Sequence, residues 1–476
     1  MSAEWRKFNL GDLTDWSSGG TPSKKNTEFW IGTIPWISAS SMRSTRYSES
    51  ELKITPEGLK SGSRLAPMGS ILLLVRGSIL HQKIPVGITT RDVAFNQDVK
   101  AIQIKRHLVD SEVIDNWYLF YWFKANEKLL LSIVESTGIG AGKLDTKQLQ
   151  GLEVDVPSWG EQQQIVACCK AIEEKEIINA QINQTLEQIA QAIFKSWFVD
   201  FEPVKAKIAA LEASGSQDDA LLAAMQVISG KDPQQLTQLQ TDNPEHYTTL
   251  RATAELFPAG MQESELGEIP EGWGTGSFKD LCLTVESGGT PKRNTPEYWG
   301  GEIKWLASGE VRDVVVLDTK EKITESGLKN SSAKLWPMYT TVVAMYGATA
   351  GQVCLIADQM TSNQACCGLI PKKNYRAFTF FSAKRSIQSL SEKASGSAQQ
   401  NLNKGLVEGH PAILPSEAIL VVYEDIAFPL MLKWIENMRE SIMLAELRYT
   451  LLPKLLSGEL SVSDLQTTNT EAAADV

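Results

Sequence analysis

The sequence has no long apolar segment and few residues of the kinds that hold metals. Its longest apolar runs, such as Ile71–Val75, are far too short to cross a bilayer, and the first residues contain no apolar signal-peptide core. We therefore expect a cytoplasmic protein without membrane contact. The six cysteines include no C-x-x-C motif, which fits a reducing compartment and argues against a zinc site or a disulfide framework. The four histidines are scattered, so no metal site is predicted.

Catalytic motifs are also missing. The stretch Gly138-x-Gly140-x-Gly142-Lys143 is superficially similar to a P-loop, but Thr137 and Leu144 stand where that motif requires Gly and Ser or Thr. There is no N/D-P-P-Y/F tetrapeptide, and no G-x-G-x-x-G follows a predicted strand. The acidic pair at 173–174 falls on a predicted helix, where a charged face explains it better than a nuclease site. The sequence predicts no catalytic residue.

Positive charge is scarce for a protein that would bind a polyanion. The formal net charge is −11. Residues 1–157 carry a net charge of +2 and residues 263–415 carry 0, whereas residues 158–262 carry −7 and residues 416–476 carry −6. Near-neutral blocks can still bind DNA through local basic loops, although non-specific affinity is then weak. The charge neither supports nor excludes DNA, and it suggests that a partner supplies part of the positive surface.

The sequence does contain an internal repeat. The motif S-G-G-T-P occupies residues 18–22 and again residues 287–291, and each copy precedes a basic stretch, an aromatic-Trp pair and a further Trp six residues later. The offset between matching features stays between 267 and 270 residues, which chance would not maintain. Further matches are K-I-T at 53–55 and 322–324, P-M at 67–68 and 337–338, N-Q at 96–97 and 363–364, and closing loops at 138–142 and 395–400.

A long helix is predicted after each block. Residues 161–198 contain no Gly or Pro, and their apolar residues follow the 3-4 spacing of a coiled coil. A second helix is expected from about 424 to 457, kinked or ended by Pro453. The two helices would pack antiparallel around a pseudo-two-fold axis. The expected seam is Ile165, Cys168, Ile172, Ile182, Leu186, Ile189 and Ile193, weakened at Lys175 and Asn179, against Leu430, Trp434, Met438, Ile442, Leu447, Leu451 and Leu455.

The blocks themselves are predicted to be mixed β domains with some helix. Short β-branched and aromatic runs alternate with turns, and a helix is expected near 111–135. The fold class is therefore α+β: two mixed-β domains separated by two long antiparallel coiled-coil helices. The expected strands are 71–75, 86–88, 101–104, 341–345, 353–356 and 368–370. The expected domains are a first block at 1–157, a central long helix at 158–202, a helical insertion at 203–262, a second block at 263–415, a C-terminal long helix at 416–461 and a disordered tail at 462–476.

Along nearly its whole length the chain resembles the specificity subunits of type I restriction–modification enzymes. The resemblance rests on the order block, helix, block, helix and on S-G-G-T-P with its following aromatic-Trp pair. It also rests on three motifs near the helix ends and the entry to the second block: F-K-S-W-F at 194–198 with D-F at 200–201, E-L-G-E-I-P-x-G-W at 265–273, and L-R-x-x-L-L-P-x-L-L-x-G-x-L at 447–460.

The resemblance implies that each block is a target-recognition domain that reads one half of a split site on double-stranded DNA. It implies that the paired helices set the distance between the halves and seat two methyltransferase subunits, which restriction–translocase subunits join. S-adenosylmethionine, ATP and Mg would be bound by those partners and no cofactor by this chain. Because the blocks are not identical, the site should be bipartite and asymmetric. The helix residues expected at partner contacts are Ile182, Leu186, Ile189, Ile193, Trp197, Trp434, Leu447, Leu451 and Leu455.

Candidate DNA contacts lie in loops at matching places of the two blocks. Lys and Arg suit phosphates or guanine, and Asn and Gln suit adenine edges. Tryptophans 30, 36, 299 and 305 are better explained as core aromatics than as base-stacking residues. Alternatively, the basic loops are solvated turns, the arginines form structural salt bridges, and the glutamines bond a turn. The candidates are Lys24, Lys25 and Asn26 with Lys292, Arg293 and Asn294, and the pairs Arg43 and Arg312, Arg76 and Tyr346, and Gln97 and Gln364.

Three other functions remain open from the sequence alone. The chain could be a duplicated coiled-coil scaffold that joins proteins without touching DNA. It could be an enzyme with two half-sites, for which no residues are apparent. A system that only methylates DNA and does not restrict it is a close variant of the preferred interpretation.

Overall fold

The computed structural model describes residues 5–138, 140–312, 314–395 and 401–462, and its contacts divide the chain into two units. The first unit combines residues 1–177 with 441–476, and the second spans 178–440. The predicted disordered tail from 463 onwards and most of the predicted loop at 395–400 lie outside the described residues.

The first unit is built on a five-stranded sheet in the order β2-β11-β7-β9-β4. Its middle strand β7 is the apolar run I-L-L-L, and all four residues are buried because both faces of the sheet are covered. A second sheet has the order β5-β3-β10-β6, and β1 pairs with β14. The bounds are β1 Arg6–Asn9, β2 Thr14–Ser18, β3 Ile34–Ile37, β4 Arg46–Tyr47, β5 Lys53–Ile54, β6 Arg64–Ala66, β7 Ile71–Leu74, β9 Val86–Thr89, β10 Val93–Phe95, β11 Val99–Ile104 and β14 Glu153–Val156.

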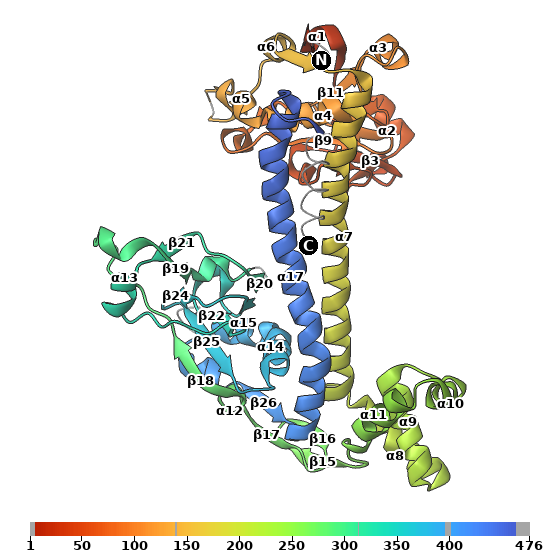
Figure 1. The fold of residues 1–476 in the computed structure, drawn as a ribbon, viewed down its shortest axis with the longest axis vertical. Helices are drawn as coiled ribbons and strands as arrows, with labels where there is room; N and C mark the ends of the chain where they lie inside the picture. Colours follow the sequence, from red (N-terminus) through yellow and green to blue (C-terminus); the bar gives the residue numbers. More distant parts are fainter. Residues whose placement is uncertain (1–4, 139, 313, 396–400, 463–476) are drawn as a thin grey trace, which may run out of the picture. The chain divides into compact units, whose positions relative to one another are not determined.

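The second unit repeats this topology (Figure 1). Its five-stranded sheet has the order β18-β25-β22-β23-β20, with three antiparallel pairs and a parallel last pair, as in the first unit. The sheet β21-β19-β24 matches β5-β3-β10, and β17 with β26 matches β1 with β14. The bounds are β17 Gly274–Ser277, β18 Cys282–Ser287, β19 Trp299–Leu306, β20 Val315–Val316, β21 Glu321–Ile323, β22 Thr341–Ala344, β23 Val353–Ile356, β24 Thr361–Ser362, β25 Cys366–Pro371 and β26 Pro411–Leu414. The repeat in the sequence is therefore a repeat of the fold, and all six predicted strands are confirmed.

Matching helices cover the two large sheets. The helix predicted near 111–135 is present as α4 (Asn116–Ala125) followed by α5 (Glu127–Ser132). The second unit has α14 (Arg376–Arg385) and α15 (Ile387–Ser395) in the same place along its repeat. In both α4 and α14 a run of six or more positions is largely buried, because each helix lies between its sheet and a long helix.

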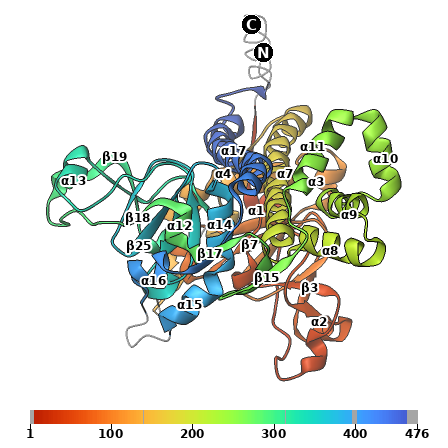
Figure 2. The same cartoon turned by 90° about the horizontal axis from the view of Figure 1, so that it is seen from below.

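The predicted helical insertion is a cluster of four helices, α8 (Glu202–Ser214), α9 (Gln217–Ser229), α10 (Pro233–Asp242) and α11 (Pro244–Glu255). They lie together in Figure 2, and α9, α10 and α11 share a small core that includes Met225, Leu236 and Leu250. Val204 of α8 belongs instead to the main core of the second unit. A hairpin of β15 (Met261–Ser264) and β16 (Gly267–Pro270) then leads into the second block.

Both long helices are present and each contributes residues to both units. The first, α7, spans Trp159–Phe198, and the second, α17, spans Glu417–Leu456. At about 1.5 Å per residue each is about 60 Å long. The expected start near 424 was wrong, because α17 begins at Glu417. Of the two effects expected of Pro453, ending the helix was wrong, because Pro429 and Pro453 both lie inside it. Both prolines are on the exposed side, where water can bond the carbonyl that a proline leaves unpaired.

The two helices pack antiparallel within each unit, but not through all the residues expected. In the second unit the buried positions of α7 are Asn179, Asn183, Ala190, Phe194, Trp197 and Phe198, whereas Ile182 and Ile189 are 38% and 43% exposed. The opposing positions of α17 include Tyr423, Met431, Trp434 and Asn437. In the first unit Ile165, Cys169 and Glu173 face Leu452, Leu455 and Arg448, while Ile442 and Leu447 are exposed.

The middle of the helix seam is polar, which explains the error. Asn183 bonds Asn437 and Asn179 bonds Glu440 in the second unit, and Glu173 and Glu176 bond Arg448 in the first. The prediction relied on apolar residues and therefore placed the seam on the neighbouring face of α7. The face of α7 that packs against α17 carries asparagine and glutamate at its centre. Of the predicted seam, Ile165, Trp434 and Leu455 are buried, and the partly buried residues are Cys168, Ile172, Leu186, Ile193, Leu430, Met438 and Leu451.

Candidate nucleic-acid interface

The S-G-G-T-P motif forms a turn that packs directly on the backbone of a neighbouring loop. A Cβ on Gly19 would stand 2.1 Å from the carbonyl oxygen of Phe95, and one on Gly288 would stand 2.1 Å from Oγ of Ser362 and 2.2 Å from the carbonyl oxygen of Asn363. Glycine is required at both places because no side chain fits between the two backbones. The glycines of the motif therefore fix where the following loop begins.

The threonine of the motif is bonded to the glutamine of the repeated N-Q pair. Oγ1 of Thr21 donates to Oε1 of Gln97 at 2.7 Å, and Thr290 makes the same bond to Gln364. Both glutamine side chains are exposed to solvent. The carboxamide oxygen of each candidate glutamine is thus engaged in the protein, so an adenine contact would rely on the amide nitrogen.

Two tryptophans in each block hold the loop in place. Nε1 of Trp36 donates to the carbonyl oxygen of Gly20 at 3.1 Å, and Trp305 repeats the bond to Gly289 at 3.0 Å. Trp30 lies edge-on to Trp36 with ring centroids 5.0 Å apart, and Trp299 lies edge-on to Trp305 at 5.1 Å. Trp36 and Trp305 are buried. The prediction that these aromatics belong to the core is confirmed for these two, and the outer pair packs against them.

The hydrogen bonds align the basic loops at an offset of 269. Nε1 of Trp30 donates to the carbonyl oxygen of Ser23 at 3.2 Å, and Trp299 makes the matching bond to Lys292 at 3.2 Å. Lys24 therefore matches Arg293, and Lys25 matches Asn294. The similar letters K-K-N-T and K-R-N-T, which suggest an offset of 268, are one residue out of register. Asn26 instead caps the 3₁₀ turn Thr27–Trp30 by accepting a bond from the backbone of Glu28.

The matched positions differ in chemistry. Lys24 and Lys25 are exposed in the first block. Arg293 is also on the surface, but its guanidinium pairs with Glu321 through both Nη atoms and lies 3.9 Å from the ring centre of Trp299. Arg293 lowers the pKa of the Glu321 carboxyl, chiefly by hydrogen bonding. The second loop thus presents an arginine that is already oriented and charge-balanced, and the first presents free-standing lysines.

The arginines after the Trp strands occupy equivalent turns, as predicted. The backbone N–H of Arg43 bonds the carbonyl oxygen of Ser41 at 2.9 Å, and that of Arg312 bonds Glu310 at 2.8 Å. Both side chains are exposed. Arg43 borders a polar hollow of about 360 Å³ that is also lined by Trp36, four serines, two glutamates and a leucine. Neither arginine is buried in a structural salt bridge.

Arg76 and Tyr346 are at matching positions too. The backbone of Leu144 bonds the residue before Arg76, and Leu402 bonds the residue before Tyr346 in the same way. Arg76 is exposed on β8 (Arg76–Gly77), and Tyr346 is 38% exposed. The candidate surface of each unit therefore consists of the basic loop, the N-Q pair and the arginine turn that follows the Trp strand.

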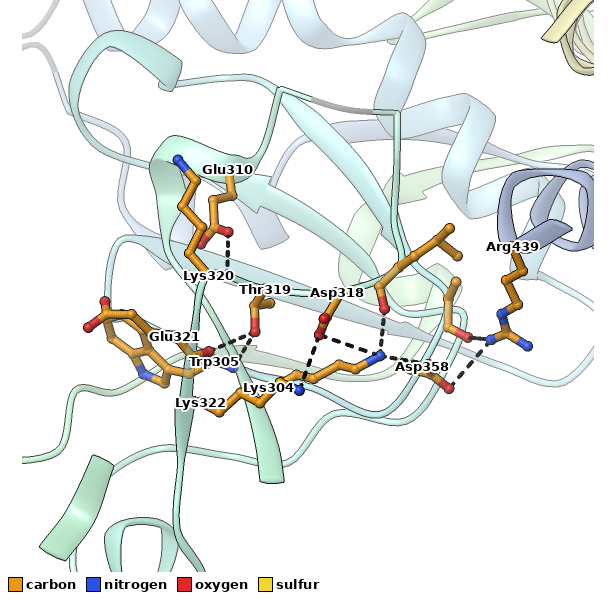
Figure 3. Close-up of polar contacts among 12 residues, drawn as sticks. Lys304, Trp305, Glu310, Asp318, Thr319, Lys320, Glu321, Lys322, Asp358 and Arg439 are labelled. Atoms are coloured by element: carbon orange, nitrogen blue, oxygen red, sulfur yellow. Dashed lines mark hydrogen bonds and ion pairs between the residues drawn. The ribbon is translucent and has the colours of Figure 1, made fainter. Parts of the chain in front are cut away.

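A polar network fastens the second surface to the long helix of its own unit (Figure 3). Lys304, on the strand that carries Trp305, pairs with Asp358 at 2.9 Å. Asp358 also pairs with Arg439 of α17 at 3.5 Å, and Arg439 donates to the carbonyl oxygen of Ala357 at 2.9 Å. Nearby, Thr319 accepts the backbone N–H of Trp305 and donates to the carbonyl oxygen of Glu321. The loop that binds Arg293 is thereby tied to the packed part of the unit.

Sequence reasoning did not identify Glu321, Thr21 or Thr290 as part of these surfaces. The threonines were visible in the repeated motif, and their pairing with the N-Q repeat could have been inferred from both copies. Glu321 had no such signal, because Leu52 occupies the matching position of the first block.

Within residues 5–138, 140–312, 314–395 and 401–462, no cluster of three or more His, Cys, Asp or Glu could hold a metal ion. In the same part of the chain, every helix is too short or too polar to cross a membrane. None of the six cysteines, all of which are described, forms a disulfide, and burial raises the pKa of Cys169, Cys282 and Cys367 to about 12.

The family described as the type I restriction modification DNA specificity domain matches residues 2–188 and again residues 270–417. The two matches contain the two surfaces described above. The whole four-helix insertion lies between them.

Known relatives match over the whole chain. The specificity subunit of the type I restriction enzyme HindI from Haemophilus influenzae is 28% identical over 474 residues, covering 96% of this chain and 100% of that protein. The MjaIX specificity subunit from Methanocaldococcus jannaschii is 25% identical and covers 97% of this chain and 95% of that protein. The crystal structure of a type I S subunit from M. genitalium superposes with a TM-score of 0.56 at 14% identity, over 95% of this chain and 96% of the other. The chain belongs to the specificity subunits of type I restriction–modification systems, the non-catalytic members that recognise the DNA sequence.

Proposed function

We propose that this specificity subunit reads an asymmetric, two-part DNA site, one half with each surface. The observation that carries the proposal is the identical anchoring of two loops that present different side chains. The same bonds from tryptophan, threonine and glycine positions fix both loops. At the matched positions stand Lys24 and Arg293, Lys25 and Asn294, and Arg76 and Tyr346. Rigid loops with different donors would select different bases.

The candidate contacts are proposed to divide by role. Lys24, Lys25 and Lys292 are exposed cations suited to phosphates. A lysine ammonium on its flexible side chain can bind a phosphate from several directions. Arg43, Arg312, Arg76 and the oriented Arg293 are suited to guanine, and Asn294 and Gln364 to adenine. Asn26 is better explained as a cap, since its oxygen already bonds the backbone.

We further propose that two methyltransferase subunits dock on the long helices and that restriction–translocase subunits join through them. Apolar side chains on one face of α7 in the second unit support this: Ile178, Ile182 and Ile189 are exposed at spacings of four and seven residues. In the first unit α17 exposes Ile442, Met443 and Leu447. Isolated exposed apolar residues are ordinary, but a row along a helix marks a protein contact. Leu186, Ile193 and Leu451 lie at the margins of these rows, whereas Trp197, Trp434 and Leu455 are buried and serve the fold.

The helices are proposed to fix the distance between the half-sites, and S-adenosylmethionine, ATP and Mg to bind the partner subunits. We also propose a cytoplasmic location, which the free thiols support because they persist in a reducing compartment.

One experiment tests the DNA proposal directly. Methylated adenines are mapped across a genome with and without the gene for this chain, with the methyltransferase gene kept in both strains. The expected result is one motif of two unlike half-sequences separated by a fixed gap, present only with the gene. A single continuous motif would contradict the two-surface proposal, and no gene-dependent methylation would favour a scaffold. For stoichiometry, native mass spectrometry of the purified complex should show two methyltransferase subunits per chain.

A further inference from the structure

A hollow of about 290 Å³ in the first unit lies where the end of α4 and the start of α5 meet the last turns of α17. Three of its lining residues are cationic, one is acidic, and the remainder are apolar or aromatic. The lining residues are Lys124, Ala125, Glu127, Lys128, Arg448, Tyr449, Leu452 and Pro453. The hollow is thus a positively charged recess with an apolar wall.

The charges that line the hollow are not all balanced. Arg448 pairs with Glu176 at 2.9 Å and with Glu173 at 3.5 Å, and the carboxylate of Glu127 accepts a bond from the backbone of Ile84. Within the described ranges no carboxylate forms an ion pair with Lys124. Burial lowers the pKa of the Lys124 ammonium, the nearby carboxylate of Glu127 raises it in part, and the charge of Arg448 lowers it. Lys124 is half-buried and forms no ion pair within these ranges, and a carboxylate in contact with it would offset the cost of its burial.

The second unit shows how the same position is satisfied. The helices α4 and α14 have ten residues each, and Lys124 and Lys384 are the ninth residue of their helix. Lys384 forms an ion pair with Glu187 of α7, and both side chains are mostly buried. The repeat therefore places a lysine at the same point twice, and among the described residues only the lysine of the second unit forms an ion pair with an acid.

We propose that an acidic side chain of a partner protein enters the first unit's hollow and pairs with Lys124, as Glu187 pairs with Lys384 in the second unit. The inference rests on the proposed docking of methyltransferase subunits and names one contact within it. A protein fits better than DNA because α17 exposes large apolar side chains at and just before the hollow: Tyr449, which lines it, and Met443 are each 62% exposed and Leu447 is 45% exposed. A phosphate backbone would leave that surface uncovered.

The proposal gives the two units different requirements. The first unit needs an acid from its partner, and the second already has its own. The partner bound at the first unit should therefore dissociate more readily at high salt, since its attachment includes a charge pair between proteins.

Zero-length carbodiimide cross-linking tests the contact directly. The reagent joins an amine to a carboxylate that is already paired with it. In the complex of the full chain with its methyltransferase subunit, we expect a cross-linked peptide that joins Lys124 to an Asp or Glu of the methyltransferase. Lys124→Met, which keeps the length without the charge, should abolish it. A cross-link map of the wild-type complex without this peptide overturns the proposal, whether or not the variant folds.

Affinity provides the second readout. Lys124→Met should weaken binding of the methyltransferase at one site about 10- to 100-fold by isothermal titration calorimetry. Lys60→Met, an exposed lysine of α2 (Pro56–Gly62) in the same unit, is the control and should bind as the wild type does. Unchanged affinity with an unchanged melting temperature overturns the proposal, as does a loss of duplex binding with normal assembly. If the wild-type chain binds no methyltransferase subunit, the proposed function itself fails.

Discussion

The side-chain amide of Asn437 donates a hydrogen bond to Oδ1 of Asn183, 3.1 Å away, inside the helix seam of the second unit. Both side chains are buried, at 3% and 9% exposure. A polar pair at a seam position favours the register in which its two members meet, because any shift would leave them buried opposite apolar groups.

The pair should show strong energetic coupling. Asn437→Leu removes the donor and leaves the buried Asn183 without this bond, so we expect a loss of about 1–3 kcal/mol in the free energy of unfolding. The double variant with Asn183→Leu should regain most of that loss, because neither amide is then left buried alone. A double-mutant cycle by urea unfolding measures the coupling. Gln184→Leu, on the exposed side of α7, is the control and should combine additively with Asn437→Leu.

The lengths of α7 and α17 should determine the gap in the DNA site. Inserting one heptad in register into both helices lengthens them by about 10 Å, which is about three base pairs at about 3.4 Å each. We expect a longer gap with both half-sequences unchanged, measured by methylation mapping. Altered half-sequences with an unchanged gap would refute the proposed role of the helices. The control for folding is a variant in which seven surface residues of each helix are substituted and none is inserted.

Each arginine turn should affect only its own half-site. Once the site is known, Arg43→Ala should weaken binding through the first half by about 1–3 kcal/mol, and Arg312→Ala should do so through the second half. Fluorescence anisotropy with duplexes scrambled in one half separates the two effects. The pair of variants serves as its own control. Loss that is equal for every duplex would instead assign these arginines to the phosphates.

Glycine at 288 should be indispensable to its surface. A methyl group there would meet Oγ of Ser362 and the carbonyl oxygen of Asn363 at 2.1 and 2.2 Å, so the loop must move. Gly288→Ala should lower stability by about 2–3 kcal/mol and abolish recognition of one half-site. Gly309→Ala is the matched control in the same unit, because nothing lies within 4 Å of its Cβ position. Thermal unfolding and duplex binding would show whether the two variants differ.

Acid should destabilise the second unit through His410. Burial, followed by the charge of Lys393, lowers the pKa of its ring from 6.5 to about 4. Phe278, Ser389 and Lys393 surround the ring, and no carboxylate within the described residues pairs with it. Between pH 6.5 and about 4 the unfolded chain binds more protons than the folded chain, so stability falls as the pH falls through this window.

The expected loss from this group is about 2 kcal/mol at pH 5 relative to pH 7. Differential scanning calorimetry at the two pH values measures it as a shift of the melting temperature. His410→Gln should show a smaller pH-dependent shift, and His246→Gln, at an exposed position of α11, should show the wild-type shift. An equal shift in all three proteins would mean that other groups cause the acid sensitivity.

The repeat made much of the fold predictable, because motifs that match in the sequence occupy equivalent positions in the two units. The central strands were recognisable because I-L-L-L at 71–74 and T-V-V-A at 341–344 are buried on both faces. The seam was not, because apolar spacing cannot distinguish two adjacent faces of a helix. The face with Ile182 and Ile189 looks more hydrophobic than the face with Asn179 and Asn183, and only the partner helix shows which one is covered.

The candidate surface was predictable in outline and not in detail. Both copies marked the loops, and matched positions such as Arg43 and Arg312 follow from the offset alone. The register of the basic loops depends on bonds from Trp30 and Trp299 to backbone carbonyls, which no side-chain similarity reveals. The partner of Arg293 could not be found either, because Glu321 lies 28 residues away and has no acidic counterpart in the first block.

The bonds from Trp30, Trp36, Trp299 and Trp305 all end on backbone carbonyl oxygens at the start of the two basic loops. A carbonyl is the same whatever side chain its residue carries. The positions that follow these anchors, Lys24 and Lys25 in one loop and Arg293 and Asn294 in the other, can therefore exchange side chains without losing these bonds. If these loops read DNA as proposed, natural variation at them generates new target sequences from a fixed scaffold, and one half of the target diverges while the other is retained.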